Sequence, residues 1–572
     1  MSKRRRIYFL SSLAIAALLV SMFGASFAFA QGQSRSAAAS STKVTAQSAT
    51  ARLVAAYTVN MQNVAPASAK SVGSVRQMPL LHNTKSGRSS VIHAPHFQAM
   101  PATTTDSASP NTPPALASFN GMADSATICP PSGCQPPDMA LAASPQWVFQ
   151  GVNTAFAVYN TSGHIQSGWP KDAQHFFNVP PVGSCDPAGP FLSDPRAFYD
   201  PNDGRFWAAV LQVEGAFGIN KCPFLTLYWI AVSQTSNPNG TWNIYAFDMS
   251  LGTTNAADYT QFGFDAHAIY FNANMFNKKG TAYVYDELFA ANKKKMENGQ
   301  SVTAFGFSHL AVNGVLVDTV QPTEGEFPTY AGPPAAVFVN TFNMNGDTSG
   351  HDCFTTACNG IVVWGMMNPG TKNETLTGFE VSTPSYISPP NADQPGCTQC
   401  IETIDTRITA TPVFNNGQVS WSIDTALTNS TQVVPGILWG QVVPQIVNGQ
   451  LVGASLYQSG YFGFEGDQDA SFGAMMPDLN GNLIMVYDTM SSTLNPSIAF
   501  TGRRATFPLG SFHDAGKFLK KGVAPTLDSR WGDYEATSYD GFSTDHIWMS
   551  SQYSGANQDW ATFIGETQFR FK

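Results

Sequence analysis

The sequence predicts an all-β protein, and three observations support this fold class. Charged residues make up only 12% of the chain, aromatic residues another 12%, and glycine and proline number 48 and 37. This composition suits many short strands joined by turns better than helices. Turn signals separate apolar runs at 202–204, 415–417, 447–449 and 479–482. The third observation is a recurring unit of about 65 residues, developed below.

Residues 1–30 have the pattern of a signal peptide. A basic stretch at 3–6 is followed by an apolar stretch at 7–27 and by Ala28-Phe29-Ala30, a small-x-small cleavage site before Gln31. The alternative is an uncleaved membrane anchor. No other stretch approaches the roughly 18 apolar residues that span a bilayer. We therefore expect a secreted or cell-surface protein with no membrane span after cleavage, and we expect a monomer.

The next segment, 31–113, is rich in Ser, Ala, Thr, Gln and Pro. Such a segment buries too little apolar surface to offset the entropy of ordering, so it is expected to be a flexible, disordered stalk with one weak element near 49–60. Three histidines, His82, His93 and His96, are interpreted as part of this linker. The formal net charge of −9 argues against nucleic acid as a partner, because nothing offers phosphates a basic face.

The chain contains eight cysteines, an even number that favours disulfides in an oxidising compartment. Local pairing is expected for Cys129–Cys134, Cys185–Cys222 and Cys353–Cys358, and Cys397–Cys400 is the least secure pair because its loop is the tightest. A zinc site made of the last four cysteines is the alternative.

Acidic residues mark the start of the recurring unit. They are Asp138, Asp194, Asp258, Asp405, Asp469 and Asp533, separated by steps of 56, 64, 147, 64 and 64 residues. The 147-residue step is about twice the others, so a further copy is expected inside it, beginning at Glu326. Each acid precedes a small-residue run, a turn and an aromatic run.

Seven units of this length, each with three or four strands, predict a single seven-bladed β-propeller over 114–572. The run after each acid would be the innermost strand of a blade. The last unit is one strand short, and 114–123 is expected to supply that strand and close the ring. A pair of β-sandwiches or a β-solenoid is the alternative. Helical spacing is found at 285–299, which we expect to be a helical insertion.

Three stretches, 405–421, 471–503 and 529–566, resemble a broad group of secreted bacterial β-propellers of the sialidase-like type. They carry, in the order of that group, an Asp-x-Arg unit, a Gly-Asn unit that ends in Gly-Arg, and an Arg-Trp-Gly-Asp-Tyr unit. The resemblance covers about residues 125–572. No activity is settled for the group, so the resemblance implies a fold and a location more than a reaction.

Three arginines, Arg196, Arg407 and Arg530, lie near the starts of innermost strands, beside the acids Asp194, Asp405 and Asp533. Arginines that converge at the mouth of the central channel would bind a ligand carboxylate bidentately, as the arginine triad of sialidases does. The structural alternative is that each Asp-x-Arg pair only links neighbouring blades.

Sialidases also need a tyrosine nucleophile paired with a glutamate. Tyr534 and Glu535 are adjacent, and neighbouring side chains of a strand point to opposite faces, so they do not easily form such a pair. The sialidase Asp-box is missing, since His164 stands where its aspartate would be.

No cofactor is expected, although acids at the channel mouth are suited to Ca²⁺ as an alternative. Asp478, Asn480 and Asn482 have the opening spacing of a calcium loop, but Leu483 and Thr489 stand where glycine and glutamate would be required. A hairpin turn is the preferred interpretation of this stretch.

The expected function is binding of an extracellular glycan or protein. A sialidase-like glycoside hydrolase or a polysaccharide lyase with its site at the channel mouth is one alternative, and a purely structural surface protein is another. Trp169, Trp531 and Trp560 would either stack on sugars or fill blade cores.

Overall fold

The computed structural model describes residues 42–69, 76–77, 79, 81, 94–101, 111–129, 133–325, 335–344, 353–528, 530–541 and 545–569. The expected signal peptide at 1–30 lies outside the described residues. Within these ranges, no helix is both long enough and apolar enough to span a bilayer.

Most strands of the described residues form antiparallel sets of four, and in all but the last set the four strands follow one another in sequence. The first three sets are β5 (Ala140–Ala143), β6 (Trp147–Val152), β7 (Ala155–Asn160) and β8 (Lys171–Asp172); β9 (Leu192–Asp200), β10 (Arg205–Glu214), β11 (Leu225–Ser233) and β12 (Thr241–Asp248); and β13 (Ala256–Phe264), β14 (Ala268–Phe276), β15 (Tyr283–Asn292) and β16 (Ala304–Val312), with the short β17 (Val315–Leu316) beside β16.

Three further sets follow the same order from the inside outward. They are β18 (Gln321–Pro322), β19 (Ala335–Phe342), β20 (Cys358–Met367) and β21 (Thr375–Tyr386); β24 (Val413–Asn415), β25 (Gln418–Thr428), β26 (Val433–Val447) and β27 (Gln450–Phe462); and β28 (Asp469–Pro477), β29 (Leu483–Ser491), β30 (Leu494–Arg503) and β31 (Lys517–Lys520). The last set is β32 (Ala536–Tyr539), β33 (His546–Ser554), β34 (Trp560–Gln568) and, from the other end of the chain, β3 (Ala115–Ala123).

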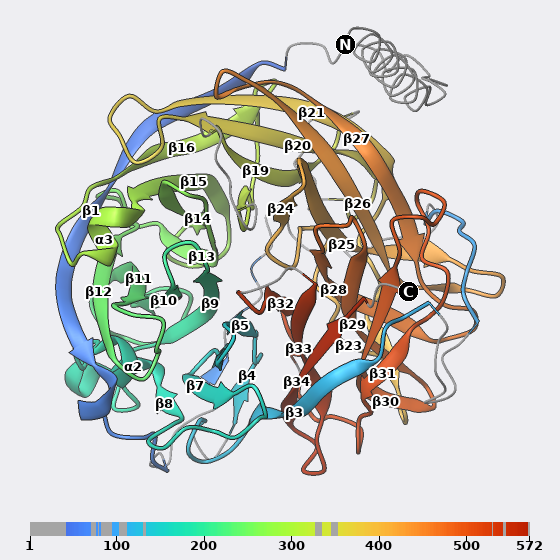
Figure 1. Cartoon of the computed structure of the whole chain (residues 1–572), viewed down its shortest axis with the longest axis horizontal. Helices are drawn as coiled ribbons and strands as arrows, with labels where there is room; N and C mark the ends of the chain where they lie inside the picture. The colour runs from blue at the N-terminus through green and yellow to red at the C-terminus, as the bar shows by residue number, and fades with distance from the viewer. Residues whose placement is uncertain are drawn as a thin grey trace, which may run out of the picture. The chain divides into compact units, whose positions relative to one another are not determined.

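Figure 1 shows the first strands of these sets, such as β5, β9, β13 and β32, gathered around the centre, with later strands farther out. This arrangement is consistent with a β-propeller. The all-β expectation is confirmed, and the repeated acids lie at or shortly before the innermost strands. The fourth repeat is placed differently, because its innermost strand β18 precedes Glu326, which itself lies outside the described residues.

The closing strand is confirmed. β3 pairs antiparallel with β34, with Ser118 opposite Gly565 and Phe119 opposite Ile564. The Phe119 ring lies 5.3 Å from Tyr159 of the first set and 6.1 Å from Trp548 of the last. The segment 114–123 therefore joins the two ends of the chain through both hydrogen bonds and packing.

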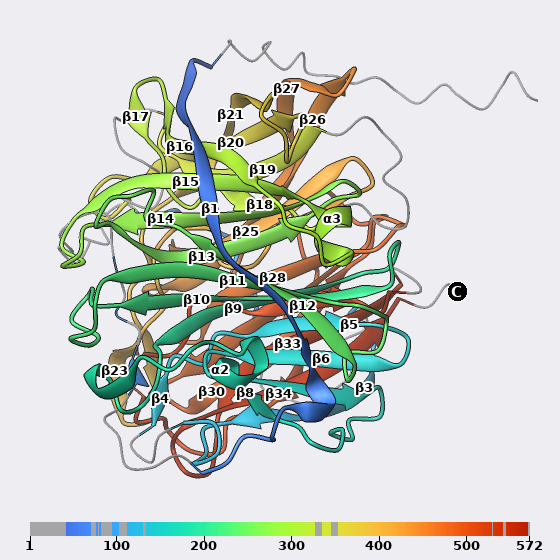
Figure 2. The same cartoon turned by 90° about the vertical axis from the view of Figure 1, so that its left-hand side faces the viewer.

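The expectation of a flexible stalk is wrong for residues 44–60. They form β1 (Val44–Asn60), which pairs antiparallel with β12 through 52–60 and with β16 through 44–51. Figure 2 shows β1 crossing the outer strands of two neighbouring sets, which it joins into one ten-stranded sheet. The outer edges of β12 and β16 supply the hydrogen-bond partners that the segment lacks alone. The weak element expected near 49–60 lies within this strand.

The helical insertion expected at 285–299 is mostly wrong. Residues up to Asn292 belong to β15, and only the five-residue α3 (Lys293–Glu297) is helical. The side chain of Asn292 caps this helix by accepting a hydrogen bond from the Lys295 N–H at 3.0 Å. Phe289 is buried in the core between two sets, so packing in the sheet overrides the helical propensity of this stretch.

Aromatic side chains fill the space between adjacent sets. Phe149, Phe156, Phe176 and Trp242 belong to one such cluster. Trp169, Trp531 and Trp560, the candidates for stacking on sugars, are 7%, 1% and 1% exposed. The stacking interpretation is therefore wrong for these three, and they serve the core.

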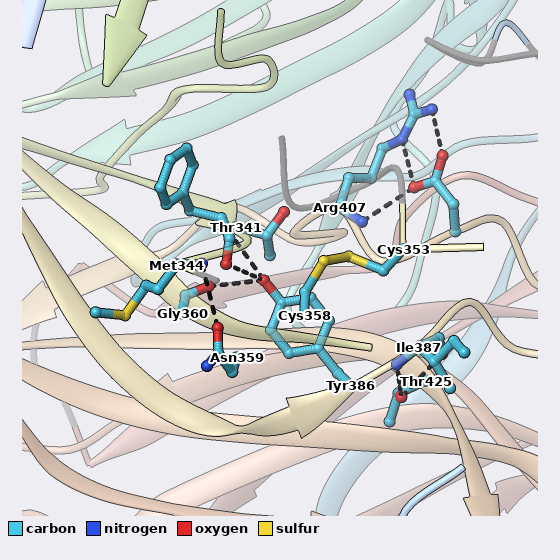
Figure 3. Close-up of a disulfide and its surroundings, with 12 residues drawn as sticks. Thr341, Met344, Cys353, Cys358, Asn359, Gly360, Tyr386, Ile387, Arg407 and Thr425 are labelled. Carbon is cyan, nitrogen blue, oxygen red and sulfur yellow. Dashed lines mark hydrogen bonds and ion pairs between the residues drawn. A yellow bond between two sulfur atoms is a disulfide. The ribbon is translucent and has the colours of Figure 1, made fainter. Parts of the chain in front are cut away.

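All four expected cysteine pairs form disulfides. The Cα atoms of Cys129–Cys134, Cys185–Cys222, Cys353–Cys358 and Cys397–Cys400 lie 5.3, 5.0, 5.7 and 6.0 Å apart. Figure 3 shows the Cys353–Cys358 bridge beside Tyr386, whose hydroxyl donates to the Gly360 carbonyl at 2.7 Å. The four cysteines of the zinc alternative are thus paired with one another in two bridges.

Candidate functional site

Two of the repeated acids, Asp194 and Asp138, bind backbone N–H groups of neighbouring sets. Asp194 in β9 accepts a hydrogen bond from the Thr260 N–H of β13 at 3.0 Å. Asp138, just before β5, accepts one from the Asp533 N–H, just before β32, at 2.9 Å. Asp194 itself has a φ of 54°, a bulge conformation that turns its carboxylate toward the next set. These acids therefore hold neighbouring inner strands together, the first and last included.

The Nε and Nη2 atoms of Arg407 are hydrogen-bonded to other groups of this chain. Its Nε and Nη2 donate to the two carboxylate oxygens of Asp405 at 2.8 and 2.7 Å (Figure 3). Nη2 also donates to the Leu81 carbonyl at 3.1 Å. The guanidinium carbon lies 4.5 Å from the centre of the Tyr259 ring. Only 1% of Arg407 is exposed. The bidentate carboxylate partner of this arginine is thus internal.

Arg530 and Arg196 are also buried and in contact with the protein. Arg530 forms ion pairs with Glu402, at 2.5 Å, and with Asp533. The Arg196 guanidinium lies 3.3 Å from the centre of the Tyr534 ring, and its Nε donates to the Thr260 carbonyl at 3.3 Å.

Two tyrosines bring Arg196 and Arg407 into one group, and Arg530 joins it through Asp533, whose carbonyl accepts a hydrogen bond from the Tyr259 hydroxyl at 3.4 Å. The Tyr259 ring lies 6.1 Å from the Tyr534 ring, and it contacts Arg407 at 4.5 Å and Arg196 at 6.0 Å. We call these residues the central cluster: Arg196, Arg407, Arg530, Glu402, Asp405, Asp533, Tyr259 and Tyr534. Sequence reasoning missed Tyr259, although the pair Asp258-Tyr259 repeats the pair Asp533-Tyr534 and offered a signal.

Burial and mutual repulsion raise the pKa of several acids around the central cluster. The pKa values of Asp138 and Asp258 lie well above the usual range, first because of burial and then because of nearby aspartates. Burial raises the pKa of Asp194 to about 6 and that of Glu402 to about 7. Acids with raised pKa values in a buried group are typical of functional sites and of structural ion networks alike.

Tyr534 and Glu535 are not paired, as the strand geometry predicts. The Tyr534 hydroxyl donates to the Pro195 carbonyl at 3.0 Å, and burial raises its pKa well above the usual value. Glu535 lies instead on the side of Asp488, which contributes to raising its pKa after burial. Asp488 accepts a hydrogen bond from the Trp531 indole at 2.7 Å, so Trp531 is fixed by a polar contact inside the core.

Open space is distributed unevenly around these residues. The channel between the innermost strands, lined among others by Arg196, Glu324 and Glu535, has only about 20 Å³ of room for water-sized molecules. A larger pocket of about 460 Å³ lies beside the Cys185–Cys222 disulfide, at the end where β9 begins.

The calcium-loop candidate at Asp478, Asn480 and Asn482 is a turn that uses its carboxylate internally. Asp478 accepts hydrogen bonds from the N–H groups of Asn480 and Asn482, both at 2.8 Å, in the hairpin turn between β28 and β29. This is the turn preferred above.

A second acidic group, formed by Asp200, Asp203 and Glu297, is neutralised by two lysines. Lys293 contacts Asp200 and lies 3.2 Å from Asp203, and Lys294 lies 3.1 Å from Glu297. The positive charges that neutralise these three acids are therefore the two lysine side chains.

No family model and no curated protein matches the sequence. Solved structures similar to the chain include sialidase-type and arabinanase-type propellers. The Penicillium chrysogenum α-L-arabinanase matches at 8% identity and a TM-score of 0.34, over 80% of this chain and 99% of that one. The haemagglutinin-neuraminidase ectodomain of parainfluenza virus 5 matches at 8% identity and a TM-score of 0.35, over 99% and 96%. The Trypanosoma rangeli sialidase matches at 10% identity and 0.31, over 65% and 54%. The propeller arrangement rests on the strand pairing above.

Proposed function

We propose that this chain is a secreted, seven-bladed β-propeller that binds an extracellular glycan or protein without chemical turnover. The seven sets of four strands would be its blades, and β3 would close the ring between the last and the first. Four local disulfides accord with an extracytoplasmic protein.

The internal neutralisation of the central cluster carries this proposal. Asp405 accepts hydrogen bonds from Nε and Nη2 of Arg407, and Glu402 and Asp533 form ion pairs with Arg530. A substrate carboxylate would have to displace these acids inside a channel with very little room. A sialidase-like hydrolase also needs a reactive tyrosine nucleophile, and burial keeps Tyr534 protonated while its hydroxyl donates a hydrogen bond to the Pro195 carbonyl.

The pocket beside Cys185–Cys222 is the ligand site we propose. Its volume of about 460 Å³ lies in the range of small-ligand sites. Phe191, Phe217 and Ile219 give it an apolar lining, and Asp186 and Lys221 add charged groups at the same place. An apolar ring face beside hydrogen-bonding groups suits a sugar, whose C–H face packs on aromatic carbon while its hydroxyls bind the polar groups.

The loop that carries this pocket is held in place before any ligand binds. Asn220 accepts hydrogen bonds from the N–H groups of Gly215 and Cys222, at 2.9 and 3.2 Å, and donates to Glu214 at 2.5 Å. A pre-organised site loses less conformational entropy on binding.

The experiment is a binding and turnover assay on the secreted form, residues 31–572. The protein is applied to an immobilised array of bacterial and plant polysaccharides, and bound glycans are then incubated with it and analysed for new reducing ends and unsaturated sugars. We expect retention without either product. Phe217→Ala should weaken retention at least about tenfold, because it removes the apolar face. Phe507→Ala, a half-buried phenylalanine outside the pocket lining, is the matched control.

Other outcomes separate the alternatives. Release of product that Arg407→Lys or Arg530→Lys abolishes, with an unchanged melting curve, would establish a hydrolase or lyase at the channel mouth. Retention of a protein ligand but of no glycan would select the protein-binding form of the proposal. If Phe217→Ala and Phe507→Ala retain the glycan equally well, the pocket beside Cys185–Cys222 is not the ligand site.

A further inference from the structure

A buried lysine and a buried aspartate meet between the second and third sets of strands. Lys293 opens α3, directly after β15, and Asp200 ends β9. Their side chains are 1% and 0% exposed, and Nζ of Lys293 contacts Oδ2 of Asp200. The two residues are 93 positions apart in sequence. A covalent bond between them would therefore join two neighbouring sets.

The surroundings of this pair are apolar. The centre of the Phe264 ring lies 5.8 Å from Nζ of Lys293, and Phe264 stacks on Phe198 with the ring centres 4.0 Å apart. Phe264 and Phe198 are both buried in the core between the two sets. An environment of this kind excludes water, which would otherwise hydrate the ammonium group and hydrolyse a reactive carboxyl derivative.

The resting pair is ionic, and a neutral form is within reach of one proton transfer. Burial lowers the pKa of Lys293, but Asp200 and Asp203 outweigh burial and raise it overall. Burial raises the pKa of Asp200, so this carboxylate accepts a proton more readily than an exposed one does. Transfer of a proton from Nζ to Oδ2 leaves an amine facing a carboxylic acid. A neutral lysine amine is a nucleophile, whereas an ammonium ion is not.

The second oxygen of Asp200 is held by backbone donors. Oδ1 accepts hydrogen bonds from the N–H groups of Asn202 at 2.9 Å and Asp203 at 3.4 Å, in the turn that follows β9. Donors at this oxygen stabilise the negative charge that develops on it when an amine attacks the carboxyl carbon. Oδ2, which contacts Lys293, is then the oxygen that departs.

A third acid is placed to move protons. Glu297 lies in the same short helix as Lys293, and one of its oxygens lies within 4.8 Å of a carboxylate oxygen of Asp200. It is 8% exposed, and its Oε1 has no hydrogen-bond partner among the described residues. Burial raises the pKa of Glu297 to about 7, so at neutral pH it both donates and accepts a proton readily.

We propose that Lys293 and Asp200 form an intramolecular isopeptide bond in the folded protein. Nζ of the neutral amine attacks Cγ of the protonated Asp200 carboxyl, and an N–C bond forms. The C–Oδ2 bond breaks, Glu297 gives a proton to the departing hydroxyl, and the nitrogen returns a proton to Glu297. The products are an amide, one water molecule and unchanged Glu297, so no oxidant, reductant or other reactant is consumed.

Two other lysines lack one of these conditions. Lys171 is also buried, but its Nζ donates to the backbone carbonyls of Val64 and Gly168, at 2.7 and 2.9 Å, instead of an acid. Lys294 contacts Asp203, but its side chain is 58% exposed, so water keeps its ammonium group charged. Burial and an acidic partner are combined at Lys293.

The bond would reinforce a junction that β1 already spans. β1 joins the second and third sets through hydrogen bonds to β12 and β16. An isopeptide link adds a connection that survives reduction and denaturation, unlike the disulfides and the strand pairing. It does not involve the pocket beside Cys185–Cys222, so its test is independent of the proposed ligand function.

The test is mass spectrometry of the secreted form, residues 31–572, after denaturation and complete reduction of the disulfides. We expect an intact mass that is lower by one water than the mass calculated from the observed N-terminus. After trypsin digestion, the segments 197–205 and 280–294 should appear as one branched peptide, because acylation of Lys293 blocks cleavage after it.

Matched variants test the three side chains. Lys293→Arg keeps the positive charge but has no lysine amine, so it should show the full mass and a free peptide 197–205. Lys294→Arg is the control and should still lose one water, because Lys294 is exposed and lies next to Lys293 in sequence. Glu297→Gln should slow the loss of water at least about a hundredfold, followed by intact mass after secretion, because it removes the proton carrier.

The proposal is overturned if the wild-type protein has the full mass, or if the water is still lost in Lys293→Arg. It is also overturned if the lost water is found as a succinimide at Asp203-Gly204, which leaves 197–205 and 280–294 as separate peptides. Should a variant fail to fold, the wild-type mass and the branched peptide still decide the question. A Glu297→Gln variant that loses water as fast as the wild type would refute the role of Glu297.

Discussion

Replacement of Arg407 by methionine should destabilise the protein strongly without any ligand present. The change removes the bidentate partner of Asp405, which is fully buried, and the donor to the Leu81 carbonyl. Breaking a buried ion pair by removing one partner costs about 3–5 kcal/mol, because the remaining charge is stranded. Unfolding a propeller of about 460 residues has an entropy of roughly 1 kcal/mol/K, so the melting temperature should fall by about 3–5 °C.

The control is Arg503→Met. Arg503 is equally buried, but it donates to the carbonyls of Arg504, Phe507 and Pro508 at 3.2, 3.0 and 3.1 Å, so its loss strands no carboxylate. We expect a smaller loss, about 1–3 kcal/mol, by urea denaturation. The double variant Asp405→Leu with Arg407→Met should lose less than the sum of the single changes. An unchanged melt for Arg407→Met would refute the structural role and return Arg407 to ligand binding.

Three further predictions concern the rest of the described chain. Loss of the Cys185–Cys222 disulfide in a double serine variant should lower the free energy of unfolding by about 4 kcal/mol, and loss of Cys353–Cys358 by about 2 kcal/mol, as measured by urea titration. The difference arises because the cysteines are 37 and 5 residues apart and loop-closure entropy grows with loop length. Equal losses would contradict this. Tyr259→Phe should cost about 1 kcal/mol by removing the hydroxyl that donates to the Ile408 carbonyl at 3.2 Å, whereas Tyr259→Leu, which also removes the ring beneath Arg407 and Arg196, should cost more in the same melt. Stability should fall as the pH rises from about 4 to about 8. Burial raises the pKa of Asp488 to about 7 and that of Glu324 to about 8, so the folded state holds these protons more tightly than the unfolded state does. Asp488→Asn and Glu324→Gln should flatten the profile, and a melting temperature that rises over this range would refute the assignment.

The repeat could be read from sequence because it is a local pattern. An acid, a small-residue run and a turn recur within each unit, so the innermost strands β9, β13 and β28 were located from spacing alone. The closing strand at 114–123 followed from the missing strand of the last unit. The disulfides were predicted for the same reason, since most of the paired cysteines are separated by five residues or fewer.

Features that depend on distant partners were missed. Strand β1 forms because it pairs with the outer edges of β12 and β16. Its own Ala- and Thr-rich sequence shows only weak alternation of apolar and polar residues. The stretch at 285–299 has helical spacing, yet its first part is drawn into the sheet by the neighbours of β15. Burial of Trp531 likewise depends on Asp488, 43 positions away in the chain.

By itself the sequence determined the all-β class, the period of the repeat and the local cysteine pairs, because each depends on spacing along a short segment. The closing strand followed from the strand that the last unit lacks. Only the tertiary structure decided the partners of the charged residues. Arg407 meets the Leu81 carbonyl across 326 positions, and Asp138 meets the Asp533 N–H across 395. Such pairs form when the inner strands converge on one axis. Where the inner strands meet, solvent access is low, so an internal carboxylate is the strongest available partner for an arginine. The arginines that were expected to bind a ligand carboxylate are therefore paired with acids of the chain itself.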